Sequence, residues 1–163
     1  MRRHLILLLA LLAAATGAET AYAATATTTF GVSASVLPSC LVGATALAFG
    51  VYDPAAGTAI DAANALTVIC TTGTVYAIGL DAGTGTNATT AVRKMSSGAN
   101  LLNYTLYQNS GRTTVWGNTA PTDTLAGVAG ILPAVINVYG RVFGSQNVQA
   151  GVYADLINVT LTY

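Results

Sequence analysis

The sequence predicts an all-β protein built as an antiparallel sandwich or barrel, and three observations lead to that prediction. Short runs of alternating apolar and polar residues recur along the chain, with the two-residue period that is typical of half-buried strands. Clusters of Gly, Asn, Asp, Ser and Pro separate these runs. Thr, Ala, Gly, Val and Tyr dominate the composition, which suits strands and tight turns better than helices.

The N-terminus has the three parts of a secretory signal peptide. Two arginines follow Met1, residues 5–15 are all apolar, and the triplet AYA at 21–23 offers a small-residue cleavage site. The apolar run is too short to span a bilayer, which disfavours the alternative of a retained membrane anchor. We therefore expect residues 1–23 to be a signal peptide, and the mature chain to be one domain of about 140 residues.

The first strand-like run of the mature chain lies within residues 24–36. Its apolar face consists of Phe30, Val32, Ala34 and Val36. Six later runs alternate in the same way, with inward faces predicted to be Leu47, Phe49 and Val51; Leu66, Val68 and Cys70; Tyr76, Ile78 and Leu80; Leu102, Tyr104 and Leu106; Ile136, Val138, Gly140 and Val142; and Ile157, Val159, Leu161 and Tyr163. The Gly- and Thr-rich segment 82–90 is expected to be the most flexible part.

The two cysteines, Cys40 and Cys70, are expected to form a structural disulfide. In an exported protein a single pair of cysteines most often forms one bridge. Their spacing excludes a CxxC redox pair, and two thiols without a histidine make a poor metal site.

The composition argues against an enzyme and against a nucleic-acid-binding protein. The only His and the only Glu, His4 and Glu19, lie in the predicted signal peptide, so a nucleophile would lack its usual base. The five Asp residues all lie in or beside turns, where capping of backbone N–H groups is the simpler interpretation. Four basic side chains against five Asp leave no basic patch for nucleic acid.

The aromatic residues allow two interpretations. They are typical of cross-strand pairs, which we favour, and they are also compatible with a sugar-binding platform. The residues in question are Tyr104, Tyr107, Trp116, Tyr139 and Tyr153.

The first and the last strand-like runs raise the question of what covers them. The run at 24–36 precedes Cys40, and the run at 152–163 closes the sequence, so neither has an obvious neighbouring strand. An unfilled sandwich edge normally leads to aggregation. A strand supplied by another chain, by β-augmentation, would resolve this.

The order of several motifs resembles the spore coat protein U domain family, which includes the pilin subunits of archaic chaperone–usher pili. The resemblance covers essentially the whole mature chain. The motifs are FGVY (49–52), RKMSSG (93–98), LNYTLY (102–107), VYGRV (138–142) and the C-terminal GVYADLINVTLTY (151–163). Two departures stand out: the segment after VYGRV lacks a Pro that the family often has, and Ala34 is smaller than the residue expected to fill a groove.

The resemblance implies an incomplete immunoglobulin-like antiparallel β-sandwich that lacks its last strand and is completed by donor-strand complementation. Residues 24–36 would be the donor strand, with Phe30, Val32, Ala34 and Val36 inserting into a neighbour, and residues 37–163 would be the pilin domain. The C-terminal strand, with Ile157, Val159, Leu161 and Tyr163, would flank the groove and pair with the incoming strand.

The resemblance also implies the partners and the function. The partners would be a periplasmic pilus chaperone, an outer-membrane usher, and identical or related pilin subunits, with no cofactor, no small-molecule substrate and no nucleic acid. The chain would cross the periplasm and become a structural, non-enzymatic subunit of a surface fibre for adhesion and biofilm formation. The alternative is a secreted spore-coat, cell-surface coat or matrix protein of the same fold.

Overall fold

The computed structural model describes residues 22–163, and the regular structure within them is almost entirely β. The elements are β1 (Cys40–Ala44), the 3₁₀ turn η1 (Pro54–Ala56), β2 (Ile60–Cys70), β3 (Val75–Leu80), β4 (Arg93–Ser97), β5 (Asn100–Tyr107), β6 (Leu125–Val128), β7 (Ala134–Val142) and β8 (Val159–Thr162). The predicted all-β class is confirmed.

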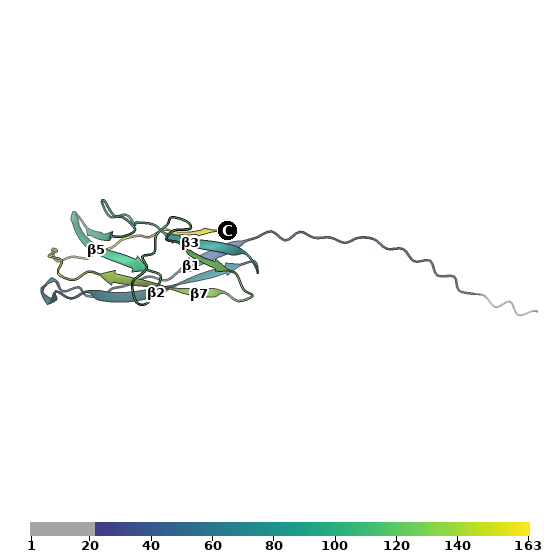
Figure 1. The fold of residues 1–163 in the computed structure, drawn as a ribbon, viewed down its shortest axis with the longest axis horizontal. Helices are drawn as coiled ribbons and strands as arrows, with labels where there is room; N and C mark the ends of the chain where they lie inside the picture. Colours follow the sequence, from purple (N-terminus) through teal and green to yellow (C-terminus); the bar gives the residue numbers. More distant parts are fainter. Residues whose placement is uncertain (1–21) are drawn as a thin grey trace, which may run out of the picture. The chain divides into compact units, whose positions relative to one another are not determined.

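The strands form two antiparallel sheets that pack as a sandwich (Figure 1). The larger sheet has the order β1-β2-β7-β5-β4, and the smaller sheet has the order β6-β3-β8. Neighbouring strands in each sheet pair antiparallel. Between the barrel and the sandwich that the sequence left open, the structure is the sandwich, as in immunoglobulin-like folds.

The core lies between the two sheets and follows the predicted alternation. The inward residues of β2, β3, β5 and β7 are buried, and the Trp116 indole lies among them with its Nε1–H donating to the Ile78 carbonyl (2.9 Å). Tyr107 faces Tyr139 directly across β5 and β7, so this aromatic pair is a cross-strand pair. The buried cluster consists of Leu66, Val68, Tyr76, Ile78, Leu80, Leu102, Tyr104, Leu106, Trp116, Ala129, Val138 and Val142.

The predicted disulfide between Cys40 and Cys70 is present, with the two residues directly opposite in the β1–β2 ladder. Removing it by Cys40→Ala and Cys70→Ala together frees a loop of 30 residues in the unfolded chain. We expect the free energy of unfolding to fall by about 3 kcal/mol. Guanidinium titration of both proteins measures this, and equal midpoints would contradict it.

An ion-pair cluster links β2 to β7 on the outer face of the larger sheet. Arg141 donates to both carboxylate oxygens of Asp61 (2.7 and 2.9 Å), and Arg112 Nε lies 3.2 Å from the same carboxylate. The hydrogen bond from Arg141 is the main cause that lowers the pKa of Asp61 below its usual value. The folded protein therefore holds this carboxylate charged more strongly than the unfolded chain does.

The Asp61 cluster predicts a small pH-dependent contribution to stability. A lowered folded pKa stabilises the protein above the unfolded pKa of about 3.9, and the contribution is lost as the pH falls from there through the lower pKa of the folded state. Because the pair is partly exposed, Asp61→Asn should cost less than about 1 kcal/mol at pH 7. Urea titrations at pH 7 and at successively lower pH values should show the difference in stability between the two proteins narrowing in acid, and a pH-independent difference would contradict this assignment.

The segment 82–90, expected to be flexible, is held to the sandwich by side chains at several points. Asp155 Oδ1 accepts from the Thr84 backbone N–H (2.7 Å) and hydroxyl (2.8 Å). Asp81 Oδ1 accepts from the Gly83 N–H, and Arg93 donates to the Thr90 carbonyl. Composition alone hides the hydrogen bonds to Asp155, because Asp155 lies 71 residues from Thr84 in the sequence.

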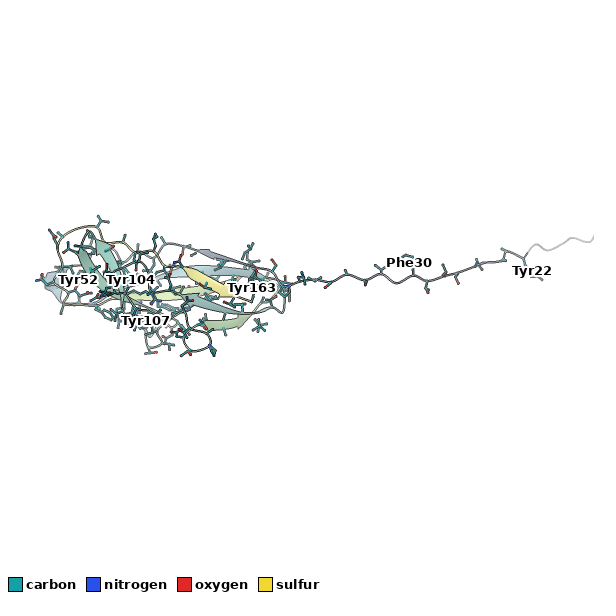
Figure 2. All side chains as sticks on the ribbon, turned by 90° about the horizontal axis from the view of Figure 1, so that it is seen from above. Tyr22, Phe30, Tyr52, Tyr104, Tyr107 and Tyr163 are labelled. Carbon is teal, nitrogen blue, oxygen red and sulfur yellow. A yellow bond between two sulfur atoms is a disulfide. The ribbon has the colours of Figure 1, made fainter. Side chains whose placement is uncertain are left out.

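Residues 22–34 belong to a separate unit from the compact unit Ser35–Tyr163. They contain no strand, and the Phe30 and Val32 side chains are each 85% exposed (Figure 2 labels Phe30). Apart from its last two residues, the predicted signal peptide 1–23 lies outside the described residues. Within 22–163 no helix has the length and the apolar character needed to cross a membrane.

Candidate functional site

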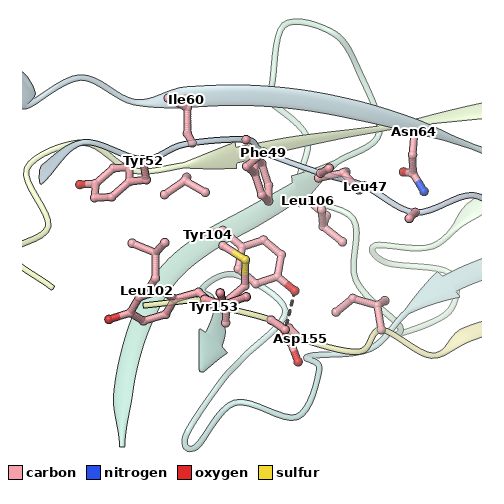
Figure 3. Close-up of a pocket in the computed structure, with 18 of the residues that line it drawn as sticks. Leu47, Phe49, Tyr52, Ile60, Asn64, Leu102, Tyr104, Leu106, Tyr153 and Asp155 are labelled. Atoms are coloured by element: carbon pink, nitrogen blue, oxygen red, sulfur yellow. Dashed lines mark hydrogen bonds between the residues drawn. The ribbon is translucent and has the colours of Figure 1, made fainter. Parts of the chain in front are cut away.

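A groove of about 1080 Å³ runs between the two sheets of the sandwich (Figure 3). This exceeds the roughly 300–1,000 Å³ of a usual small-molecule pocket. Its floor is apolar and comes from the core strands, namely from Leu66, Leu80, Leu102, Leu106, Val138 and Val142. Two extended segments border the groove. We call residues 45–52, which follow β1, the first bank, and residues 152–159, which lead into β8, the second bank.

The first bank directs Leu47, Phe49 and Tyr52 into the groove. The sequence predicts that Val51 continues this face, but Val51 is 91% exposed and Tyr52 takes its place. The reason is Gly50, whose φ of +78° breaks the extended backbone and shifts the alternation by one residue. The expected strand over this segment is likewise absent, because its backbone has no partner strand.

The second bank directs Tyr153, Ile157 and Val159 toward the core. The sequence predicts one long strand over 152–163, whereas β8 spans only Val159–Thr162 and a single bridge joins Ala154 to Ser96. Between Ala154 and β8, polar side chains accept hydrogen bonds from the backbone in place of a neighbouring strand. Asp155 Oδ1 accepts from the Leu156 N–H, and Asp81 Oδ1 accepts from the Asn158 N–H.

The facing edges of the two banks carry unpaired backbone groups. Along the first bank the last backbone–backbone hydrogen bond is from Thr45 N–H to the Ala65 carbonyl (3.1 Å), and none within residues 22–163 involves residues 46–51. Among residues 152–157 of the second bank, only Ala154 makes such bonds with the described part of the chain, residues 22–163. Within the described residues β8 pairs with β3 alone, so its other edge is open. An apolar cleft with two open backbone edges is the geometry that accepts an additional β-strand.

The polar groups in the groove are fixed by hydrogen bonds. The Tyr104 hydroxyl donates to Asp155 Oδ2 (2.7 Å), as the dashed line in Figure 3 shows. Burial, reinforced by this hydrogen bond to a carboxylate, raises the pKa of Tyr104 well above its usual range. The second Asp155 oxygen accepts three further hydrogen bonds, so this carboxylate is a structural acceptor.

One polar atom at the groove has no partner. Asn64, on β2, donates through Nδ2 to the Thr45 carbonyl, at the start of the first bank. Its Oδ1 is buried and accepts no hydrogen bond from any residue in 22–163. Asn64 lines the groove at the opposite end from Tyr52 (Figure 3).

The five Asp side chains behave as the turn interpretation predicts, with one exception. Asp53, Asp81, Asp123 and Asp155 each accept a backbone N–H, while Asp61 pairs with arginines. In the part of the chain that the structure describes, no three His, Cys, Asp or Glu side chains gather in a way that could hold a metal ion.

The residues predicted for the site come from the C-terminal strand, the donor segment and the disulfide, and the structure places these three groups differently. Ile157 and Val159 line the groove; Leu161 instead lies opposite Ile78 in the β3–β8 ladder, and Tyr163 is 58% exposed. The proposed donor residues Phe30, Val32 and Ala34 lie in the separate N-terminal unit, with Val36 just inside the compact unit, and all four are exposed. Cys40 and Cys70 lie outside the groove lining.

Sequence reasoning did not identify the first bank as part of the site. The alternation of Leu47 and Phe49 gave a strand face, but nothing local shows that this face borders an opening. The nearest signal is Gly140 of β7, where a Cβ atom would lie 2.7 Å from the Phe49 ring. A glycine in the middle of a strand often marks such a close approach.

Comparisons with known proteins agree on a family and a fold. The family described as Spore Coat Protein U domain matches residues 26–160. Protein U of Myxococcus xanthus is 35% identical over 159 residues, covering 88% of each chain.

One solved structure gives the likeness in fold. It is the pre-assembly complex of the chaperone CsuC with the tip adhesion subunit CsuE, from archaic chaperone–usher Csu pili of Acinetobacter baumannii. One of its chains matches with a TM-score of 0.58 and 24% identity over 78% of this chain. The match spans about two fifths of that chain's length (40%).

Proposed function

The chain belongs to the Spore Coat Protein U domain family, and from that premise we propose that it is a structural subunit that polymerises by donor-strand exchange. In this proposal residues 24–36 of one copy insert into the groove of the next copy. The product is a surface fibre of the archaic chaperone–usher type, with a role in adhesion and biofilm formation. The role is structural and not enzymatic.

The observation that carries the proposal is the match between the open groove and the exposed N-terminal segment. The groove offers an apolar floor and two banks of unpaired backbone. Residues 24–36 offer an alternating apolar face and contain no strand of their own. The groove therefore lacks a strand, and residues 24–36 are a strand-like segment that lacks an apolar surface to cover its apolar face.

The energetics favour a durable joint. Phe30, Val32 and Val36 are at least 79% exposed, and full burial of side chains of this kind contributes about 1.5–3 kcal/mol each. The backbone hydrogen bonds to the two banks add on the order of 1 kcal/mol each, net. The conformational entropy lost when the segment becomes ordered opposes both contributions. The stability of the joint therefore depends on how much apolar surface the groove buries.

The same groove explains the proposed assembly partners. An open apolar edge would aggregate during export, so a periplasmic chaperone would cover it until an outer-membrane usher brings the next subunit's segment. The similar solved structure, a pre-assembly complex of a chaperone with a pilus subunit, supports the chaperone-bound stage of this proposal. We propose that the chain passes through the periplasm and resides in a fibre at the cell surface.

A variant that lacks residues 24–36 tests the proposal when mixed with the wild-type chain during assembly. It keeps a groove but has no strand to donate, so it should enter each fibre only at one end. Mean fibre length in electron micrographs should fall as its share rises. A matched variant with Ser33→Ala in the intact segment should leave fibre length unchanged. Fibres of constant length at every ratio would contradict donor-strand exchange.

The match to Protein U and the name of the family favour a second candidate, a secreted coat or matrix component of the same fold. The two roles differ in where the protein resides. Immunogold labelling of intact cells would show thin fibres for a pilus subunit, and a continuous layer on the cell or spore for a coat protein.

A further inference from the structure

We propose that the incoming strand is oriented by one polar pair: the Thr28 hydroxyl of the donor copy donates a hydrogen bond to Asn64 Oδ1 of the receiving copy. This inference rests on the proposed donor-strand exchange and adds to it the direction and the register of the inserted strand. Both residues belong to this chain, so each joint of a fibre of identical subunits would contain one such pair.

The first observation is the unpartnered amide oxygen. Asn64 Oδ1 is buried and has no hydrogen-bond donor within residues 22–163, while the Nδ2 of the same side chain is satisfied by the Thr45 carbonyl. A buried acceptor without a donor is costly, and an amide oxygen accepts readily from a hydroxyl. Asn64 lines the groove, so a rotation of its side chain on strand insertion would bring this oxygen to a hydroxyl that enters beside it.

The second observation concerns the apolar face of the donor segment. In an extended strand, residues at even spacing share one face, so Phe30, Val32, Ala34 and Val36 lie on the same side as Thr28. From 26 to 36 that face has a single polar member, Thr28, directly before Phe30. One hydroxyl at the end of an apolar face matches one buried acceptor at the end of an apolar groove.

Matching the two ends fixes the direction of the strand. Asn64 marks the end of the groove at Thr45, and Tyr52 and Tyr153 mark the other end (Figure 3). With Thr28 beside Asn64, the donor runs parallel to the first bank and antiparallel to the second bank. The reverse direction would place Val36 against the unsatisfied oxygen.

The lengths agree with this placement. Residues 28 to 36 span about 26 Å when extended, at about 3.3 Å per residue. The first bank from 45 to 52 spans at most about 23 Å by the same measure, because Gly50 interrupts its extended backbone. The four apolar donor residues therefore cover the groove from Leu47 to Tyr52 when Thr28 lies at Asn64.

A double-mutant cycle in assembled fibres measures the pair. Thr28→Val removes the hydroxyl and keeps the shape of the side chain, so joints should dissociate in guanidinium about fivefold faster, the equivalent of about 1 kcal/mol. Thr28→Ser should retain most of the wild-type lifetime. Thr29→Val, on the opposite face, is the matched control and should change little. In an Asn64→Leu background, Thr28→Val should have no further cost.

Cysteine cross-linking tests the direction independently of stability. Fibres of the Thr28→Cys, Asn64→Cys chain should give a ladder of covalent oligomers on oxidation, and fibres of the Val36→Cys, Asn64→Cys chain should not. The opposite pattern would overturn the orientation. If Thr28→Val speeds dissociation equally in the wild-type and Asn64→Leu backgrounds, the proposed hydrogen bond between Thr28 and Asn64 is wrong. Donor-strand exchange itself would still stand in that case, because the fibres form. If the wild-type chain forms no fibres at all, the proposed function fails, and the pairing fails with it.

Discussion

A chain that carries Phe30→Asp and Val32→Asp is expected to fold normally and to form no fibres. Both side chains are 85% exposed in the separate N-terminal unit, so the substitutions leave the sandwich core unchanged. In the proposed joint the two carboxylates would enter an apolar groove, where an unpaired buried charge costs several kcal/mol or more. The measurements are the thermal melt of the purified chain and a fibre count by electron microscopy.

The matched control places the same two charges on the other face of the same segment. Ser33→Asp and Ser35→Asp add equal charge, but these side chains would point away from the groove floor. This variant should assemble, with at most a modest loss at low salt. Assembly of the Phe30, Val32 variant at the wild-type level would contradict the assigned donor face.

The largest loss of folding stability is expected from Arg93→Met. Arg93 is fully buried and donates to four backbone carbonyls, those of Leu80, Asp81, Thr90 and Trp116, at 2.7–2.9 Å. Burial lowers the pKa of its guanidinium, but the carbonyls surround a group that stays charged at neutral pH. Met would leave these acceptors unpaired, at about 1–3 kcal/mol each, so we expect a loss of at least about 4 kcal/mol.

Guanidinium titration of the purified chain tests this role of Arg93. Arg93→Lys should recover only part of the loss, because one ammonium group cannot reach carbonyls on all sides as a planar guanidinium does. Arg112→Met is the control: Arg112 donates to two backbone carbonyls, against four for Arg93, and its side chain is partly exposed, so its loss should be clearly smaller. If Arg93→Met unfolds at nearly the same guanidinium concentration as the control, Arg93 does not make the large contribution to stability that is assigned to it here.

The sequence predicts the four strands that have neighbours on both sides, and it predicts the edge strand β8 at too great a length. β2, β3, β5 and β7 alternate clearly because one face of each packs into the core. β4 and β6 were not predicted: β4 is largely polar, and β6 has only four residues. β1 was missed because its five residues, CLVGA, contain no polar residue and so show no alternation. These strands are determined by their partners and not by their own pattern.

The site was predictable only in part, for a related reason. The second bank has an alternating pattern, which identified Ile157 and Val159. Leu161 continues the pattern but packs in the β3–β8 ladder, beyond the end of the groove. The first bank depends on Gly50, whose backbone conformation moves Tyr52 to the inner face, and the sequence does not report a φ angle. The buried oxygen of Asn64 depends on contacts across strands that only the folded chain defines.

The most direct test of the groove is a thermal melt of the chain without residues 24–36, with and without a synthetic peptide of those residues. A peptide at about one hundred times its dissociation constant would stabilise the domain by about 2.7 kcal/mol. The expected upward shift is roughly 10 °C for a domain of this size. The same peptide with Phe30→Asp and Val32→Asp should give no shift. A domain that melts at the same temperature with and without the native peptide would contradict donor-strand complementation.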